Sequence, residues 1–209
     1  MSHIVLLGDS IFDNRSYTNG GPDVVSQVRE LLPSGWSASL LAVDGSTTED
    51  IPAQAQGIPP SASHLVLSVG GNDALMNSDI LHTAVESTSR ALAELAEVSR
   101  QFEIKYRAAV ATCRERGLPL AICTIYNGNF PDRQYQRLAS TALMVFNDVI
   151  LRVGFELALT VIDLRFVCST AEDYANEIEP ASQGGAKIAG CILAAVERLG
   201  RPEARVIIG

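Results

Sequence analysis

The chain has 209 residues, 47% of them hydrophobic, with charges of both signs interspersed along it; this length and composition suit one folded core and exclude a disordered chain. The formal net charge is −8 at pH 7. An acidic surface repels phosphate backbones, so we expect no nucleic-acid partner and favour a neutral or cationic small molecule over a polyanion.

The sequence also bears on where the protein is located and on whether it binds a metal. The start of the chain runs straight into an apolar strand pattern without a basic region or a cleavage site, and no stretch approaches roughly 18 unbroken apolar residues. We therefore expect a cytoplasmic protein with no membrane span. The four cysteines are isolated and form no CxxC or Cys/His cluster, which predicts buried free thiols and no structural zinc site: Cys113, Cys123, Cys168 and Cys191.

Strand and helix patterns alternate along the chain. Short apolar runs predict five strands, at residues 3–7, 36–43, 64–69, 120–125 and 159–164. Apolar residues at helical spacing predict a helix opened by Pro22 and Asp23, a long helical stretch over 78–116 with a kink or break, and helices over 137–157 and 182–199. This alternation predicts βαβ units, hence a single three-layer α/β/α domain over residues 1–209 with five parallel strands.

Small and polar residues follow the predicted strands. In an open parallel sheet, ligands bind beyond the carboxyl ends of the strands, so the turns at these ends are the candidate site. The first three turns are Gly8-Asp9-Ser10, Asp44-Gly45-Ser46 and Gly70-Gly71-Asn72-Asp73, and residues 126–129 and 176–180 follow the fourth and fifth strands.

Three of these turns together suit acyl transfer. Ser10 offers a hydroxyl just past a strand end, Gly45 an unobstructed backbone N–H, and Asn72 a side-chain amide. With the Ser10 N–H, these donors would form an oxyanion hole for a tetrahedral intermediate, at on the order of 3 kcal/mol each. Any one of these turns is a common loop sequence, but three at successive strand ends favour a genuine site.

These residues resemble the SGNH, or GDSL-like, hydrolase superfamily over essentially the whole chain. The matching blocks are Gly8-Asp9-Ser10 with the nucleophile, Gly45, and Gly70-Gly71-Asn72-Asp73. The resemblance implies a flavodoxin-like sheet of order 2-1-3-4-5. It also implies hydrolysis of an ester, thioester or carbohydrate O-acyl group, with no metal or cofactor.

The fourth block departs from the pattern of that superfamily. Where the family usually has Asp-x-x-His, this chain has Asn176 and, three residues later, Glu179 followed by Pro180. A free glutamate has a pKa of about 4.3 against about 6.5 for histidine, so Glu179 is a weak base unless burial raises its pKa. Asn176 at least avoids placing a second carboxylate beside it.

Other residues are assigned supporting roles or set aside. His3 and His64 begin strands at the far edge of the sheet, and His82 is expected on a helix surface. We expect Asp13 and Asn14 to brace the nucleophile turn through hydrogen bonds to its backbone, as Asx residues commonly do, with Asp9 and Asn176 as further supporting residues. Aromatic residues are candidates for the pocket wall: Tyr17, Tyr126 and Phe130.

Three hypotheses follow from the retained nucleophile and the missing histidine. The first is a hydrolase in which Glu179 activates Ser10. The second is a pseudoenzyme that binds an acylated or carbohydrate ligand in the same pocket. The third is a protein-interaction domain that keeps the fold alone. For the first two we expect a small ester or acylated molecule as the partner, and no oligomeric state is predicted.

Overall fold

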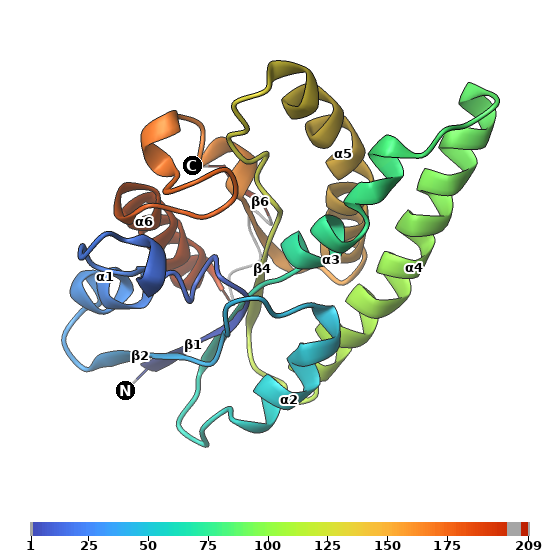
Figure 1. Cartoon of the computed structure of the whole chain (residues 1–209). Helices are drawn as coiled ribbons and strands as arrows, with labels where there is room; N and C mark the ends of the chain where they lie inside the picture. The colour runs from blue at the N-terminus through green and yellow to red at the C-terminus, as the bar shows by residue number, and fades with distance from the viewer. Residues whose placement is uncertain (1, 200–205, 209) are drawn as a thin grey trace.

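The computed structural model describes residues 2–199 and 206–208, and it places a parallel sheet between two layers of helices (Figure 1). The strands are β1 (Ser2–Gly8), β2 (Trp36–Leu40), β3 (His64–Ser68), β4 (Leu120–Cys123), β5 (Thr160–Asp163) and β6 (Val206–Ile208). Their order is β2-β1-β3-β4-β5-β6, with every neighbouring pair parallel. The expected α/β/α fold and the order 2-1-3-4-5 are confirmed, and β6 adds a strand beside β5 that the sequence patterns did not predict.

Two layers of helices cover the sheet. The α-helices are α1 (Val24–Leu31), α2 (Ile51–Gln56), α3 (Gly71–Met76), α4 (Thr88–Arg114), α5 (Arg133–Glu156) and α6 (Ser182–Arg198). Short 3₁₀ helices are η1 (Arg15–Tyr17), η2 (Thr48–Asp50), η3 (Ser78–His82), η4 (Leu164–Phe166) and η5 (Ala171–Asp173). Figure 1 shows α1 and α6 on one face of the sheet and α2, α4 and α5 on the other.

Several element ends differ from the sequence prediction for local reasons. The strand expected over 36–43 leaves the β ladder after Leu40, because Leu41 and Ala42 both donate their N–H to the Leu6 carbonyl. The long helical stretch is broken as expected, with η3 and α4 separated by residues 83–87. Helix α5 begins four residues earlier than expected, because the Asp132 carboxylate accepts the N–H groups of Gln134 and Tyr135 and so caps it.

The two faces of the sheet carry separate apolar cores because side chains alternate along each strand. In β1, Ile4 and Leu6 pack toward α1 and α6, whereas Val5 and Leu7 pack toward α2, α4 and α5. Three of the four cysteines are buried, and all four are free thiols. The buried free thiols that the sequence predicted are thus confirmed for Cys113, Cys123 and Cys168, while Cys191 is half-buried.

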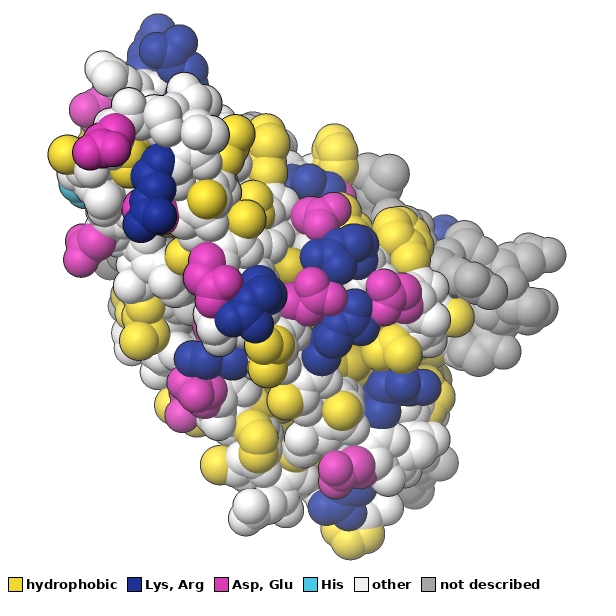
Figure 2. Space-filling model, turned by 90° about the vertical axis from the view of Figure 1, so that its right-hand side faces the viewer, with side chains coloured by type: hydrophobic (Ala, Val, Ile, Leu, Met, Phe, Trp, Pro, Cys, Tyr) yellow, Lys and Arg dark blue, Asp and Glu magenta, His cyan; other side chains and the backbone are white. Residues whose placement is uncertain are grey.

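The outer face of α4 and α5 is covered by ion pairs. Figure 2 shows basic and acidic side chains alternating on the side of the molecule that carries α4. Glu103 of α4 pairs with Arg107 at 2.7 Å and with Arg152 of α5 at 3.0 Å, so one carboxylate joins the two helices. Exposed pairs of this kind contribute roughly 0.2–1 kcal/mol each, which makes them a minor term beside the buried core.

Helix α5 is long and apolar enough to cross a membrane, judged by length and composition alone. The core helix of a globular protein meets the same criterion. In this structure Val149, Ile150 and Val153 of α5 are buried against the sheet, which accounts for that side of the helix.

Candidate active site

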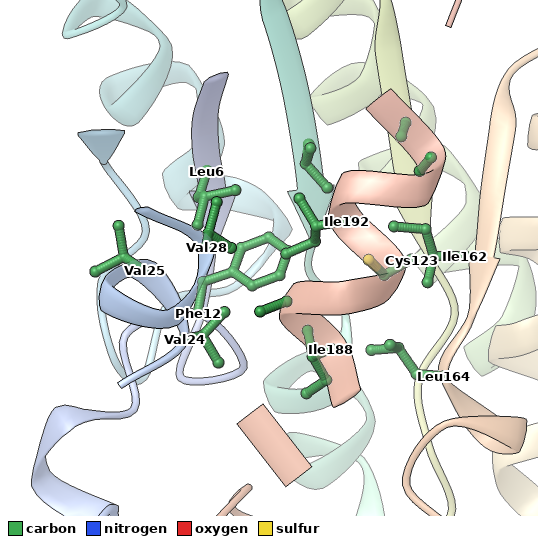
Figure 3. Close-up of a cluster of buried hydrophobic side chains, with 14 of the residues drawn as sticks. Leu6, Phe12, Val24, Val25, Val28, Cys123, Ile162, Leu164, Ile188 and Ile192 are labelled. Atoms are coloured by element: carbon green, nitrogen blue, oxygen red, sulfur yellow. The ribbon is translucent and has the colours of Figure 1, made fainter. Parts of the chain in front are cut away.

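The turn after β1 is shaped by one glycine and one buried ring. Gly8 has φ of 132°, and a Cβ on it would lie 1.7 Å from the Ser68 carbonyl oxygen of β3, so only glycine fits where the chain enters the turn. Two residues past Ser10, the Phe12 ring is fully buried among side chains of α1 and α6 (Figure 3). Burial of such a ring is worth roughly 1.5–3 kcal/mol, and it holds Ser10 at the carboxyl end of the sheet.

The backbone of this turn is braced by Asp9. Its carboxylate accepts the Ile11 N–H at 3.1 Å, and its carbonyl accepts those of Phe12 and Asp13 at 3.1 Å each. With those N–H groups already paired, the expectation that Asp13 and Asn14 brace the same backbone is wrong.

Asp13 and Asn14 reach neighbouring loops instead. Asp13 accepts the Asp44 N–H at 3.0 Å, which ties the first turn to the second. Asn14 accepts the Val24 N–H at 2.9 Å and donates to the Pro180 carbonyl at 3.1 Å, which ties the nucleophile turn to the loop that carries Glu179. Both residues therefore support the site by joining its loops.

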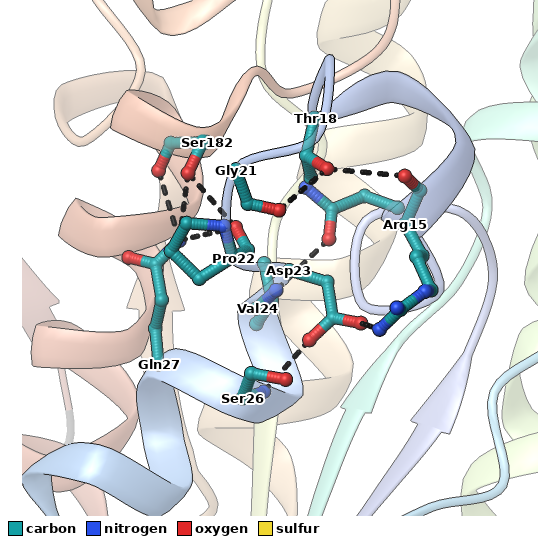
Figure 4. A network of polar contacts seen from close by, with 10 residues as sticks. Arg15, Thr18, Gly21, Pro22, Asp23, Val24, Ser26, Gln27 and Ser182 are labelled. Carbon is teal, nitrogen blue, oxygen red and sulfur yellow. Dashed lines mark hydrogen bonds and ion pairs between the residues drawn. The ribbon is translucent and has the colours of Figure 1, made fainter.

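The segment after the nucleophile turn is fixed to α6. Figure 4 shows the contacts around Pro22, whose carbonyl accepts hydrogen bonds from the Ser182 hydroxyl and the Gln27 amide, each at 2.8 Å. Asp23 caps α1 by accepting the Ser26 N–H and pairs with Arg15 at 3.6 Å. These bonds keep Arg15 engaged away from the serine.

Two backbone N–H groups and one side-chain amide are the donors that the sequence predicts for an oxyanion hole. The N–H groups of Ser10 and Gly45 donate no hydrogen bond to any other residue that the structure describes, so both are free for a ligand. Gly45 has φ of 81°, which favours glycine. Asn72 donates one amide hydrogen to the Ser46 carbonyl at 2.8 Å, and because the amide has two hydrogens, one stays free.

A residue that the sequence did not single out joins these turns. Gln54, buried in α2, accepts the Gly8 N–H and donates to the Gly8 carbonyl, both at 2.8 Å, and it also donates to the Ser46 hydroxyl at 3.1 Å. Asp73 accepts the Thr48 N–H at 3.0 Å and the Thr48 hydroxyl at 2.6 Å. The three turns are thus linked through side chains and need no ligand to bring them together.

The loop after β5 presents Glu179 toward Ser10. Asn176 accepts the backbone N–H groups of Ile178 and Glu179 at 2.9 Å each, so it shapes the loop without bonding to the Glu179 side chain. The buried Asp173 pairs with Lys187 of α6 at 2.6 Å and anchors the start of the loop. Glu179 lines the same cavity as Ser10.

The Glu179 carboxyl has the properties of a tuned base. It is 7% exposed, and its Oε2 atom has no hydrogen-bond partner among the described residues. Burial raises the pKa of Glu179 to about 7, while interaction with the Ser10 side chain acts in the opposite direction. A base with a pKa near the working pH is a far better proton acceptor than a free glutamate.

A second buried carboxyl lies in the same cavity. Burial raises the pKa of Asp9 to about 8, its hydrogen bond from Ile11 lowers it, and the nearby Glu179 and Asp73 raise it further. Asp9 is therefore mostly protonated at pH 7, and the site carries less negative charge than its sequence suggests.

None of the three histidines lines the cavity that contains Ser10. His3 bonds to the hydroxyls of Ser61 and Ser39, and His64 to that of Ser63, all at the amino edge of the sheet as expected. His82 lies in η3 and stacks on Tyr135 of α5 with ring centroids 6.3 Å apart. Within the described residues no group of His, Cys, Asp and Glu side chains could hold a metal ion.

A cavity of about 120 Å³ extends from Ser10 beneath α3 and η3 and between α4 and α5. Its floor beside the serine is polar, with Asp9, Asn72 and Glu179, and its far walls are apolar. Of the expected aromatic wall residues, Tyr126 and Phe130 line it and Tyr17 does not. Tyr17 instead donates a hydrogen bond to Asp44 at 2.8 Å.

Comparison with known proteins gives one family and many related folds. The model of the GDSL-like lipase/acylhydrolase family matches residues 6–184. A search of curated proteins finds no significant sequence match.

Several solved structures share the fold. A lipase from a goat rumen metagenome is 21% identical, with a TM-score of 0.72 over 97% of this chain and 100% of that one. A lipolytic protein of the G-D-S-L family from Veillonella parvula is 16% identical (TM-score 0.69; 95% and 100% covered), and a carbohydrate acetylesterase from Sinorhizobium meliloti is 11% identical (TM-score 0.63; 94% and 99%).

Proposed function

Because the chain belongs to the GDSL-like lipase/acylhydrolase family, and is at that level an ester hydrolase, we propose that Ser10 is its nucleophile and Glu179 its general base. The observation that carries this proposal is the buried Glu179 carboxyl, which interacts with the Ser10 side chain and lines the same cavity, while its Oε2 atom has no hydrogen-bond partner among the described residues. Several solved neighbours are themselves named lipases or acetyl xylan esterases, which supports ester hydrolysis as the reaction.

The reaction proceeds in two halves. Ionised Glu179 accepts the Ser10 hydroxyl proton while Oγ bonds to the ester carbonyl carbon, and the negative charge moves to the carbonyl oxygen. The N–H groups of Ser10 and Gly45 and the amide of Asn72 stabilise that oxyanion. Glu179 then gives the proton to the departing alkoxide, which leaves an acyl-serine. Water then attacks the acyl carbon while Glu179 accepts its proton. Glu179 returns this proton to Ser10 Oγ as the bond between Oγ and the acyl carbon breaks and the carboxylic acid leaves.

Binding without turnover is the second candidate function. The observation that favours it is the placement of all three histidines away from Ser10. In that case the cavity would hold an acylated ligand while Ser10 stays unmodified.

One assay separates the two functions. Purified protein is given p-nitrophenyl acetate from about pH 5 to pH 9, for wild type beside Ser10→Ala, with release of nitrophenolate followed. Hydrolysis by wild type, lost in Ser10→Ala, supports the serine hydrolase. Equal rates for the two proteins would reject Ser10 as the nucleophile and leave ligand binding as the surviving proposal.

A further inference from the structure

From Ser10 the cavity reaches apolar side chains of four helices. Its inner walls are formed by Leu75 of α3, Ile80 and Leu81 of η3, Leu95 and Val98 of α4, and Leu143 of α5. Of the described lining residues, Asp9 and Glu179 alone carry a carboxyl group, and none carries a basic one. Such walls stabilise an aliphatic chain by excluding water from it.

Small side chains keep this space open. Ala139 and Ala142 lie one turn apart on α5 and both line the cavity, opposite Ala74 of α3. Larger residues at these positions would close the route from Ser10 to the apolar walls. The depth of the cavity therefore depends on a few alanines.

The rim around Ser10 has the opposite character, because it is acidic. The loops beside the serine (residues 9–22, 43–48, 71–78, 125–131 and 175–180) carry a single basic side chain, Arg15, and six carboxyl groups. Asp9, Asp73 and Glu179 are buried, so the carboxylates that reach the rim are those of Asp44 and Glu177, which are exposed, and Asp13, which is half-buried. Arg15 is paired with Asp23. Asp44, next to the oxyanion donor Gly45, is exposed and faces solvent at this rim. A negatively charged group brought here is repelled by these carboxylates. Among the described residues of these segments it finds no unpaired cation.

We infer that the substrates are esters or thioesters that join an aliphatic acyl chain, held in the cavity beneath η3, to a neutral or cationic alcohol or thiol at the acidic rim. The inference rests on the proposed function, because the reacting carbonyl is placed between Ser10 and its oxyanion donors. From that point the acyl chain follows the apolar walls and the leaving group emerges at the rim. Leaving groups rich in phosphate, such as coenzyme A, are disfavoured.

The chain-length part is tested with p-nitrophenyl acetate and p-nitrophenyl hexanoate. Four more buried methylenes should raise kcat/KM by on the order of 100-fold. Ala142→Phe fills the cavity and should lower kcat/KM for the hexanoate ester much more than for the acetate ester, which removes most of that preference. Met144→Phe is the matched control, because Met144 is 61% exposed on the same helix and does not line the cavity. Equal use of the two esters by wild type, or equal loss of both in Ala142→Phe, would overturn the assignment.

The leaving-group part is tested with two thioesters of the same acyl chain. Hexanoyl-N-acetylcysteamine is neutral and hexanoyl-coenzyme A is polyanionic, while the bond that breaks is the same. At low ionic strength the neutral thioester should be preferred by at least about tenfold, and added salt should narrow the gap. Asp44→Asn should narrow it as well, whereas Glu30→Gln, an equal charge change at the exposed end of α1, should not. Equal or faster use of the coenzyme A ester contradicts the inference.

The acyl cavity can be tested apart from catalysis. N-methylhexanamide is not hydrolysed readily, so its binding can be followed by thermal shift in wild type, Ser10→Ala and Ala142→Phe. We expect it to stabilise wild type and Ser10→Ala, and to have a smaller effect on Ala142→Phe. If wild type binds the amide but hydrolyses no ester, the hydrolase function is rejected and the acyl-binding role of the cavity stands. If wild type hydrolyses both esters equally well, the acyl-binding role of the cavity is rejected and the hydrolase function stands.

Discussion

The pH dependence of activity gives the sharpest test of Glu179 as the base. With a pKa of about 7, the carboxyl is ionised to about one tenth at pH 6 and is almost fully ionised by pH 8. Because only the ionised form can accept the Ser10 proton, kcat/KM of wild type should rise about tenfold per pH unit below pH 7 and level off above it. A free glutamate would give this limb near pH 4.3.

Replacement of Glu179 by glutamine keeps the size of the side chain and removes its basicity. Loss of a general base costs roughly 10²–10⁴-fold, so Glu179→Gln should lower kcat/KM by at least about 100-fold at pH 7.5. The limb near pH 7 should also disappear. The assay is initial-rate hydrolysis of p-nitrophenyl acetate at half-unit pH steps in buffers of constant ionic strength.

A neighbouring carboxylate supplies the control for this experiment. Glu177 is exposed and two residues away on the same loop, so Glu177→Gln makes the same chemical change and should leave the profile as it is. Survival of the limb near pH 7 in Glu179→Gln, or a loss of less than about threefold, would refute the assignment of Glu179 as the base.

Three further predictions concern the stability of the turn and the oxyanion hole. Burial gives Asp9 a folded pKa of about 8 against 3.8 for the free group, so the folded protein binds more protons between those pH values and its stability falls as pH rises. Asp9→Asn should remove up to about 3.5 kcal/mol of the fall between pH 5 and pH 8, measured by urea unfolding at these two pH values. Gly8→Ala should destabilise the fold by about 3 kcal/mol through backbone strain and overlap with Ser68, and an unchanged melting temperature would contradict that reading. Asn72→Ala should lower kcat by roughly 10²–10³-fold with little change in KM, and a proportional rise in KM instead would argue for ground-state binding.

The strands follow from signals that are local in the sequence, whereas their order 2-1-3-4-5 follows from the resemblance to the SGNH superfamily. Most predicted strands are apolar runs that end at a glycine or a polar residue. The inner strands β1, β3, β4 and β5 are largely buried from both faces, whereas the edge strand β2 is only partly buried. The sheet then brings the three polar turns to one edge without further information. This is why the sequence alone places Ser10, Gly45 and Asn72 at one edge of the sheet.

The residues that join the turns carried no comparable signal. Gln54 bonds to Gly8 across 46 positions, and Asn14 bonds to Pro180 across 166. Helix α2 has six residues, too few for an apolar periodicity to show which side is buried. The pKa of Glu179 was equally hidden, because it depends on burial by residues from several loops.

The apolar cavity could not be predicted for a related reason. Helix α3 occupies residues that read as turn chemistry, with Gly71, Asn72 and Asp73 at its start. The lining comes from four elements whose outward and inward sides the sequence alone does not separate. The space forms only where α3 and η3 lie over α4 and α5 in the folded chain.

The hydrogen bonds of Asn176 bear on which side chains the proton-accepting position of this loop could carry. Because the loop is shaped through backbone contacts of Asn176 and through the link from Asn14 to Pro180, its conformation does not depend on the identity of residue 179. The side chain at position 179 could therefore be replaced while the loop keeps its conformation. A histidine there, with an aspartate at 176, would test whether one scaffold can host two proton-transfer chemistries after only two replacements.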